Sequence, residues 1–252
     1  MDLGLKEKRV LITGGTRGIG ASIVDTLLDE GASVAYCARN SDEIATTLAV
    51  YKAKGANVWA KACDVGNPAE YQAWLAEAVS ALGGADIFIP NVSAGANAGE
   101  EGWQAAFNVD LMATVRGCEA MLGELVKGVD PSIVVITSIA GLEIMGEPGP
   151  YNTIKAGLIT YASQLGDIAA QHGIRVNCVS PGPIHVDDGF WGKVQSAQPG
   201  TYNQVAERHP MNRLGTTAEV AKTVAFLVSP AASWITRTNV IVDGGFSRRI
   251  QF

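Results

Sequence analysis

Short apolar runs alternate with longer helical stretches along the whole chain. Each run is continuously apolar instead of alternating with polar residues, which is typical of a strand buried on both faces of a sheet. Seven such strands separated by helices predict a doubly wound parallel sheet with helices on both faces, an α/β fold. The expected strands are 9–13, 32–38, 57–65, 85–92, 132–139, 173–182 and 238–245.

Helices are expected between these strands, with one long stretch left irregular. Ser41 is the expected N-cap of its helix, and Pro68 and Pro150 suit a first helical turn. Residues 185–212 carry no clear helical or strand pattern, and no Gly-, Pro- or Ser-rich linker divides the chain. We therefore expect one domain over residues 1–252. The expected helices are 18–31, 41–55, 68–83, 101–127, 150–172 and 217–228.

Composition excludes several classes of protein. The net charge is −6, which argues against nucleic acid as the main partner. No apolar run approaches a membrane span, and the first residues lack the apolar segment of a signal peptide, so we expect a soluble cytoplasmic protein. The four cysteines form no CxxC pair and the three histidines lack metal-ligand spacing. We expect no metal site and no disulfide.

A glycine-rich segment, TGGTRGIG at 13–20, lies between the first expected strand and the first helix. Gly14, Gly18 and Gly20 permit a tight turn and a close approach of the backbone to a pyrophosphate, with Gly20 allowing the helix to pack on the strand. The start of the following helix offers free N–H groups to an anion. The segment predicts a dinucleotide-binding site.

The end of the second strand indicates which dinucleotide. NAD sites usually carry an acidic residue there for the ribose 2′-hydroxyl, but this chain has Ala38 followed by Arg39. Arg17 lies inside the glycine segment, and two guanidinium groups suit a 2′-phosphate. The sequence thus predicts NADP(H). Asp64 could contact the adenine or cap the next helix.

Tyr151 and Lys155 stand four residues apart just after a Pro-Gly-Pro break. On a helix these positions share one face, near a positive helix start. The ammonium and the helix dipole both favour the phenolate, which makes Tyr151 a candidate proton donor and acceptor.

Ordered motifs from end to end carry a family resemblance. They include TGGTRGIG, CDV at 63–65, PNVSAG at 90–95, FNVDL at 107–111, ITSIAG at 136–141 and YNTIK at 151–155. With RVNCVSPGPI at 175–184 and VDGG at 242–245, the chain resembles the short-chain dehydrogenases/reductases. The resemblance implies a seven-stranded Rossmann-type sheet and an enzyme that interconverts a ketone and a secondary alcohol with NADP(H).

The resemblance also implies residue roles. Tyr151 is the expected general acid and base, and Lys155 the group that favours its phenolate and binds the nicotinamide ribose. Ser138 is expected to hydrogen-bond the substrate oxygen, and Asn108, on the long helix, to hold a water that links Lys155 to solvent. The full predicted cofactor set is Gly14, Thr16, Arg17, Gly18, Ile19, Gly20, Arg39, Asp64, Val65, Asn91, Tyr151, Lys155, Pro181, Gly182 and Ile184.

Two positions depart from the family pattern. Ser93 replaces a glycine near the cofactor, where its side chain could narrow the site. Val186 stands where the family often has a threonine that touches the nicotinamide carboxamide, so the anchor must be backbone or another residue, with His185 as one candidate.

The substrate is the least determined feature. Residues 185–212 are the expected lid, and Phe190 and Trp191 either line an apolar pocket or pack the lid onto the domain. Ser93 and Met145 are expected in the other walls. A general ketone reductase is the first interpretation. A 3-oxoacyl-thioester reductase is the alternative, disfavoured because the helix 101–127 is acidic, and a non-catalytic NADP-binding sensor or scaffold is the second alternative.

The two long helices predict assembly. Residues 101–127 and 150–172 carry more small and apolar positions than one face of a sheet requires, and the equivalent helices pair in the family. A homotetramer is expected.

Overall fold

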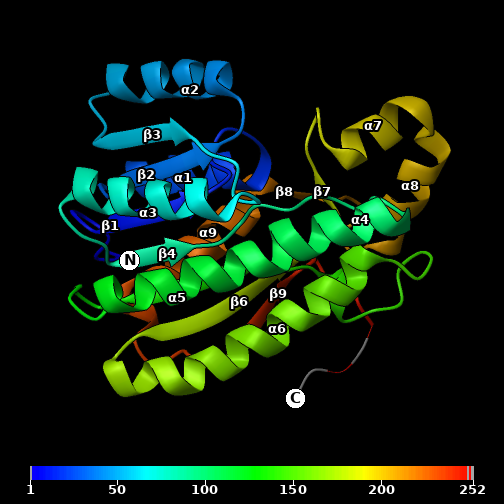
Figure 1. Ribbon diagram of the computed structural model, residues 1–252. Helices are drawn as coiled ribbons and strands as arrows, with labels where there is room; N and C mark the ends of the chain where they lie inside the picture. The colour runs from blue at the N-terminus through cyan, green and yellow to red at the C-terminus, as the bar shows by residue number, and fades with distance from the viewer. Residues whose placement is uncertain (1, 249, 251–252) are drawn as a thin grey trace.

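The computed structural model describes residues 2–248 and 250. Its centre is a seven-stranded sheet in the order β3-β2-β1-β4-β5-β6-β9, in which every adjacent pair is parallel (Figure 1). The expected α/β fold is confirmed. The strands are β1 (Arg9–Thr13), β2 (Ser33–Ala38), β3 (Val58–Ala62), β4 (Ile87–Ile89), β5 (Ser132–Ile136), β6 (Arg175–Pro181) and β9 (Asn239–Val242).

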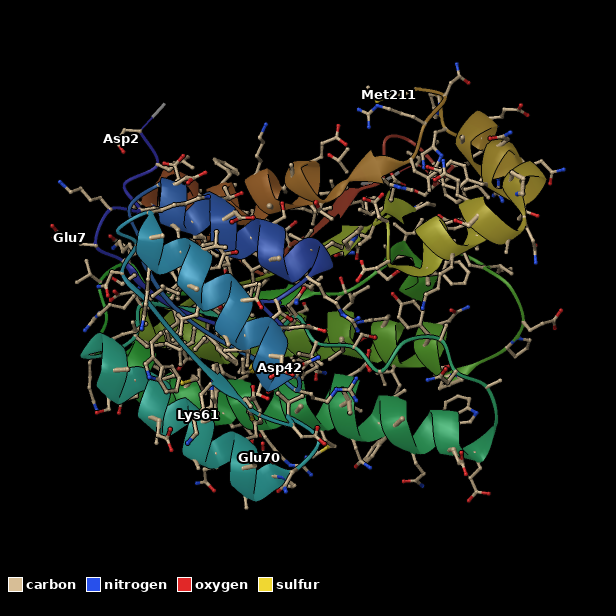
Figure 2. All side chains as sticks on the ribbon, turned by 90° about the horizontal axis from the view of Figure 1, so that it is seen from above. Asp2, Glu7, Asp42, Lys61, Glu70 and Met211 are labelled. Atoms are coloured by element: carbon tan, nitrogen blue, oxygen red, sulfur yellow. The ribbon has the colours of Figure 1, made fainter. Side chains whose placement is uncertain are left out.

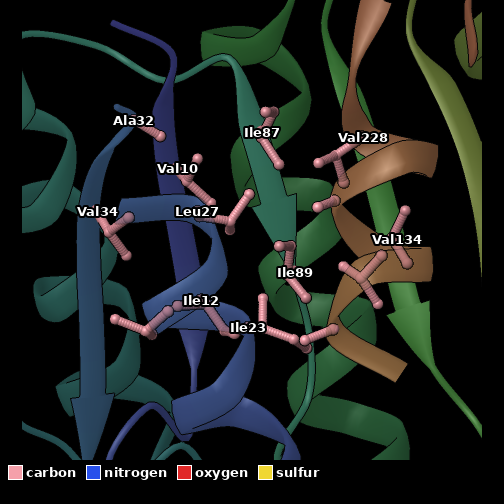
Figure 3. Close-up of a cluster of buried hydrophobic side chains, with 14 of the residues drawn as sticks. Val10, Ile12, Ile23, Leu27, Ala32, Val34, Ile87, Ile89, Val134 and Val228 are labelled. Atoms are coloured by element: carbon pink, nitrogen blue, oxygen red, sulfur yellow. The ribbon is translucent and has the colours of Figure 1, made fainter. Parts of the chain in front are cut away.

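Helices cover both faces of the sheet and bury two separate apolar cores. On one face lie α1 (Gly18–Asp29), α2 (Ser41–Ala53) and α9 (Thr217–Val228), and Figure 3 shows Ile23 and Leu27 of α1 packed against the strands. On the other lie α3 (Pro68–Leu82), α5 (Ala113–Leu125) and α6 (Pro150–Ala169). Strands buried from both sides explain why their sequences are continuously apolar.

The strand order reverses next to β1, whose neighbours are β2 and β4. Chain segments leaving β1 and β4 therefore diverge to opposite faces of the sheet, and a crevice forms where they part at the carboxyl ends of the strands. The glycine segment at 13–20 and the loop at 90–98 both begin at this point. The fold thus locates the candidate site before any side chain is considered.

The long helix expected at 101–127 is present as three consecutive segments. These are α4 (Gly99–Ala105), the π-helical η1 (Ala106–Met112) and α5. A π-helical turn inside an α-helix is rare and often marks a functional site. It lies beside α6, and the apolar residues Ala106, Ile154 and Leu158 form a small core between them.

Two expectations about local structure are wrong. Residues 185–212 contain the strand β7 (Ile184–His185) and two helices, α7 (Phe190–Ala197) and α8 (Pro199–Arg208), instead of an irregular stretch. Asn40, not Ser41, caps α2, because its side chain accepts hydrogen bonds from the backbone N–H groups of Asp42 and Glu43. Figure 1 shows α7 and α8 beyond the carboxyl edge of the sheet, and Figure 2 shows Met211 at the rim beside them.

The remaining short elements connect these parts. They are the 3₁₀ turns η2 (Ile139–Gly141), η3 (Ala170–His172) and η4 (Pro230–Ala232), and β8 (Gly215–Thr216), which pairs with β7. Within residues 2–248 and 250, no helix has the length and apolar character needed to cross a membrane. All four cysteines are free and buried.

Candidate active site

The glycine segment forms a tight loop from β1 to α1. Gly14 and Gly18 have φ angles of +77° and +59°, which other residues rarely adopt. A Cβ on Gly20 would collide with the Gly14 carbonyl oxygen and lie 2.6 Å from Nδ2 of Asn91. Asn91 fastens the loop by donating to the carbonyl oxygens of Thr13 and Gly14 at 2.9 and 3.1 Å. The helix start is thereby left open to the crevice.

A cavity of about 500 Å³ lies at the carboxyl ends of β2, β3 and β4. It brings together predicted cofactor residues that are far apart in sequence. Of the predicted set, Gly14, Thr16, Arg17, Arg39, Asp64, Val65 and Asn91 line it, as does Ser93. The lining residues that were not predicted are Cys37, Ala38, Asn40, Glu43, Cys63, Val92, Ala94, Asn97, Ala105 and Val109.

Charges of both signs face this cavity. Arg17 and Arg39 are the cations, and Glu43 in the first turn of α2 is an unexpected anion. The Glu43 carboxylate accepts a 2.9 Å hydrogen bond from Oγ1 of Thr16, which holds it beside the glycine segment. Its position was missed because an acidic residue in a first helical turn is ordinary and the sequence gives no sign of what it faces.

Two thiols also line the cavity. Burial, and then the neighbouring Cys63, raise the pKa of the Cys37 thiol well above its ordinary value. Cys37 is therefore neutral at physiological pH and behaves as a small apolar side chain. Asp64 does not cap α3; Asn67 does, and Oδ1 of Asp64 instead accepts from the N–H of Gly66.

A second cavity of about 390 Å³ lies between the glycine segment and the segment around α7. Arg17 and Asp188 face each other across it at 3.9 Å, both largely exposed. The predicted residues Gly18, Ile19, Gly20 and Phe190 contribute to its walls, with Val186, Gly189 and Lys193. Arg17 and Asn91 belong to both cavities, which therefore adjoin along the glycine segment.

Tyr151 and Lys155 lie on one face of α6, as expected. The Lys155 ammonium is 5.6 Å from the centre of the Tyr151 ring. Lys155 is only 2% exposed, and its Nζ donates to the carbonyl oxygen of Ile136, at the end of β5, at 3.3 Å. Pro150 occupies the first turn of α6, so the pair lies at the helix start at the carboxyl edge of the sheet.

Ser138 reaches the same helix from the other side. It follows β5, and its hydroxyl accepts a 3.1 Å hydrogen bond from the N–H of Ala140 in η2. The η2 turn lies against α6 so closely that a Cβ on Gly141 would come within 2.6 Å of the Ala156 nitrogen. Gly141 thus permits the approach that brings Ser138 to the start of α6.

Asn108 is exposed to solvent, and its expected role of holding a water for Lys155 stays a prediction. The residue of the long helix that faces Lys155 is Asp110, whose Oδ1 lies 3.3 Å from the lysine Nζ with both side chains buried. Positions 106, 110, 113, 117 and 121 form the buried face of this long helix. Their residue types do not mark that face in the sequence. Asp110 falls on that face and Asn108 does not.

The remaining predicted residues lie around this edge. Pro181 ends β6, Ile184 begins β7, and Gly182 lies between the two strands. The carbonyl oxygen of Met145 accepts from Nδ2 of Asn152, next to Tyr151, at 2.7 Å. Phe190 is 68% exposed, and its ring packs edge-on against Trp191 with centres 5.1 Å apart.

His185 contacts the segment that follows it. One ring nitrogen lies 3.0 Å from Oδ1 of Asp187 and the other 3.1 Å from the Tyr202 hydroxyl in α8. His185 therefore ties α8 to β7. No group of three or more His, Cys, Asp or Glu residues that could hold a metal occurs in the part of the chain that the structure describes.

Comparisons with known proteins show which families and folds this chain is similar to. A family model described as enoyl-(acyl carrier protein) reductase matches residues 14–247. The isoepoxydon dehydrogenase of Penicillium expansum is 36% identical, over 99% of this chain and 98% of its own. Dehydrogenase/reductase SDR family member 4 of Bos taurus is 32% identical, over 96% and 88%. Among solved structures, L-sorbose reductase of Gluconobacter frateurii, complexed with NADPH and L-sorbose, has a TM-score of 0.90, 28% identity and coverage of 99% and 100%.

Proposed function

The chain belongs to the short-chain dehydrogenase/reductase family, and on that premise we propose that it interconverts a ketone and a secondary alcohol with NADP(H), using Tyr151 as general acid and base. The observation that carries the proposal is the Tyr151 ring 5.6 Å from the buried Lys155 ammonium. A phenol beside a fixed positive charge can release and recover a proton, which carbonyl reduction and alcohol oxidation both require.

The residues around the two cavities fit a dinucleotide. No side chain caps the start of α1, so its first N–H groups are available to a pyrophosphate. The contact at Gly20 leaves no room for a side chain where the backbone would approach that group. Arg17 and Arg39 supply two cations for a 2′-phosphate. The relative complexed with NADPH supports the same cofactor here.

When bound, the cofactor supplies the hydride. Tyr151 donates its proton to the substrate oxygen during reduction and accepts it during oxidation. Lys155 holds a positive charge beside the Tyr151 ring and would hold the ribose hydroxyls of the cofactor. The Ser138 hydroxyl uses a lone pair to accept from Ala140, so its proton remains available to the substrate oxygen.

We propose that residues 185–212 form the lid. The second cavity supports this proposal, because α7 and the residues before it form one of its walls and the glycine segment forms the other. Phe190, Trp191, Ser93 and Met145 are its proposed substrate contacts. An acidic acyl carrier is disfavoured, because Glu100, Glu101 and Glu119 are exposed on α4 and α5. Asp110, an acidic residue of the same long helix, is buried and does not contribute to this surface.

We also propose a cytoplasmic homotetramer. Four free cysteines are typical of a reducing compartment. Large apolar side chains are exposed on or next to the long helices: Phe107, Val126 and Ile168. Such side chains favour contact between copies of the chain. Sedimentation that shows only monomer at micromolar concentration would overturn the assembly.

The testing experiment joins cofactor binding to turnover. Fluorescence titration should show NADPH binding at least about tenfold tighter than NADH, a difference of about 1.4 kcal/mol. Tyr151→Phe should lower the ketone-reduction rate by about 10²- to 10⁴-fold and leave NADPH binding nearly unchanged. Equal loss of binding and turnover contradicts the role of Tyr151.

Tyr161→Phe is the matched control on the same helix. The Tyr161 hydroxyl is buried and has no hydrogen-bond partner among the described residues, so its removal should leave the rate unchanged. If no ketone or alcohol in a broad panel turns over although NADPH binds, the non-catalytic interpretation replaces the enzyme.

A further inference from the structure

Asp110 and Lys155 form an ion pair that is almost fully enclosed. Each residue is 2% exposed, and Oδ1 of Asp110 is 3.3 Å from Nζ of Lys155. The other carboxylate oxygen accepts a 2.7 Å hydrogen bond from the backbone N–H of Ala94. Asp110 therefore connects three segments: the π-helical η1, the loop after β4 and the start of α6.

Burying this ion pair costs free energy, because both charges lose their contact with water. A buried charge needs a partner and hydrogen bonds to offset its loss of water. The family resemblance places its asparagine at Asn108, two residues earlier on this helix. Asp110 brings a full negative charge next to the lysine that is proposed to act on Tyr151.

We propose that Asp110 is a positioning residue that fixes the Lys155 ammonium between η1 and β5 and, by its charge, sets the pH at which Tyr151 loses its proton. This inference rests on the proposed function of Tyr151. The carboxylate offsets part of the lysine charge, so the phenol keeps its proton to a higher pH than it would beside Lys155 alone. Asp110 thus favours the proton-donating form, which is the form that carbonyl reduction needs.

Few other titratable groups face this pair. Cys178 of β6 is close enough for the Lys155 ammonium to act on it, but burial raises the pKa of that thiol to about 12, with the ammonium opposing the rise, so it remains neutral. Glu100 and Glu101 of α4 are exposed to solvent. Glu143 follows η2, which also packs on α6. Asp110 is in direct contact with Lys155.

The size of the effect follows from Coulomb's law. Oδ1 of Asp110 is 3.3 Å from Nζ of Lys155, and that Nζ is 5.6 Å from the centre of the Tyr151 ring, so Asp110 lies within about 9 Å of the ring. Two unit charges at that distance interact appreciably at an effective dielectric constant near 20. Removing the negative charge should lower the pH of phenolate formation by about one unit.

The test uses the protein without cofactor or substrate. Ultraviolet difference titration of wild type against Tyr151→Phe isolates the Tyr151 phenolate signal. The subtraction removes the signals of the other tyrosines, which both proteins share. Burial also raises the pKa values of Tyr36, Tyr51, Tyr71 and Tyr161 above their ordinary value, which moves those four hydroxyls to higher pH. The titration is then repeated in the Asp110→Asn background.

Asp110→Asn should shift the Tyr151 midpoint about one unit toward acid, and the alcohol-oxidation rate profile should move with it. Asp167→Asn is the control, because it removes one charge from an exposed position at the far end of α6. Unchanged midpoints in Asp110→Asn, or equal shifts in both variants, overturn the proposal.

Asp110→Glu keeps the charge and changes its position. Its phenolate midpoint should stay near the wild-type value even if turnover falls, and a midpoint matching Asp110→Asn would contradict the role of the charge. If Asp110→Asn does not fold, Asp110→Ser removes the same charge: its midpoint should also move toward acid, and an unchanged midpoint overturns the proposal. A protein that shows the shift but turns over no substrate refutes the proposed function and leaves the electrostatic inference standing.

Discussion

Two buried aspartates lie at opposite ends of the same sheet, and their surroundings differ. Asp86 precedes β4 at the amino ends of the strands, and its two oxygens accept four hydrogen bonds, from N, Nε and Nη2 of Arg9 and from the N–H of Val129. Asp110 lies at the carboxyl ends, and accepts one hydrogen bond besides its contact with Lys155. Both are 2% exposed.

The difference shows how one residue type serves two purposes. A carboxylate with every lone pair engaged can do no more than hold its donors together, so Asp86 joins β1, β4 and the start of β5. A carboxylate with capacity left, in contact with a lysine beside Tyr151, can respond to a change of charge. Saturation of hydrogen bonds, more than burial, separates the two.

The largest expected effect is a loss of stability on changing Asp86, at the amino ends of the strands. Asp86→Asn should lower the free energy of unfolding by about 3 kcal/mol, because it leaves the Arg9 guanidinium without its counter-charge. Urea denaturation measures this loss. Asp130→Asn is the matched control: Asp130 pairs with Lys8 at the same end of the sheet but is 55% exposed, so its loss should be below about 1 kcal/mol. Similar losses in both variants would remove the distinction.

At acid pH the stability difference between wild type and Asp86→Asn should disappear. Burial raises the pKa of Asp86, but the hydrogen bonds from Arg9 and Val129 and the charge of Arg9 outweigh it, so the net pKa is lowered. A lowered pKa gives stability that is present above the ordinary value near 4 and is lost as the pH falls through the folded-state value. The gap between wild type and Asp86→Asn should therefore narrow below about pH 4. A gap that is constant with pH would show that the charge of Asp86 is not its source.

The central strands could be predicted from sequence because they are covered on both faces. Their apolar runs, such as Val10–Ile12, are continuous. The run at 224–228 of α9 is equally apolar, and β9 at the sheet edge is only half-buried, so length and flanking residues also had to decide. The lid could not be predicted in this way. Its helix α8 has no buried residue, so no apolar stripe marks it, and Pro199 in its first turn is the one local signal.

The site residues that follow from local backbone geometry were predicted from the sequence. Those whose place depends on packing against other elements were missed. Glycines at 14, 18 and 20 and the i, i+4 pair at 151 and 155 follow from local rules. The choice between Asn108 and Asp110 depends on which side of a π-helical turn meets α6. Asn40 and Ser41 are both good N-caps, and only the path of the chain after β2 selects Asn40.

Removing a charge at the adenosine end of the crevice should weaken cofactor binding moderately, because the charges there are exposed. Arg39→Ala should weaken NADPH binding by about tenfold and leave NADH unchanged, since only the 2′-phosphate distinguishes the two. Fluorescence titration measures both constants. Lys54→Ala, an exposed cation at the other end of α2, is the control and should change neither. Equal weakening of NADPH and NADH would mean that Arg39 does not read the phosphate.

The smallest expected effect is a gain in affinity for NADPH. Glu43 lines the same cavity as Arg17 and Arg39, so its negative charge opposes a 2′-phosphate. Glu43→Gln keeps an oxygen to accept from Thr16 and removes the charge. NADPH binding should tighten by about two- to fivefold, as expected for one half-buried charge at the rim of a cavity, with NADH unchanged.

Asp42→Asn separates position from net charge. Asp42 is the neighbouring residue in the first turn of α2, labelled in Figure 2, is exposed, and is not among the residues that line the cavity. Both variants change the net charge by one unit and weaken the same helix-start interaction. If only Glu43→Gln tightens NADPH, the site selects its cofactor through a carboxylate as well as two guanidinium groups. If Asp42→Asn tightens it equally, the general field of the protein acts, and 0.5 M salt should abolish both gains by screening.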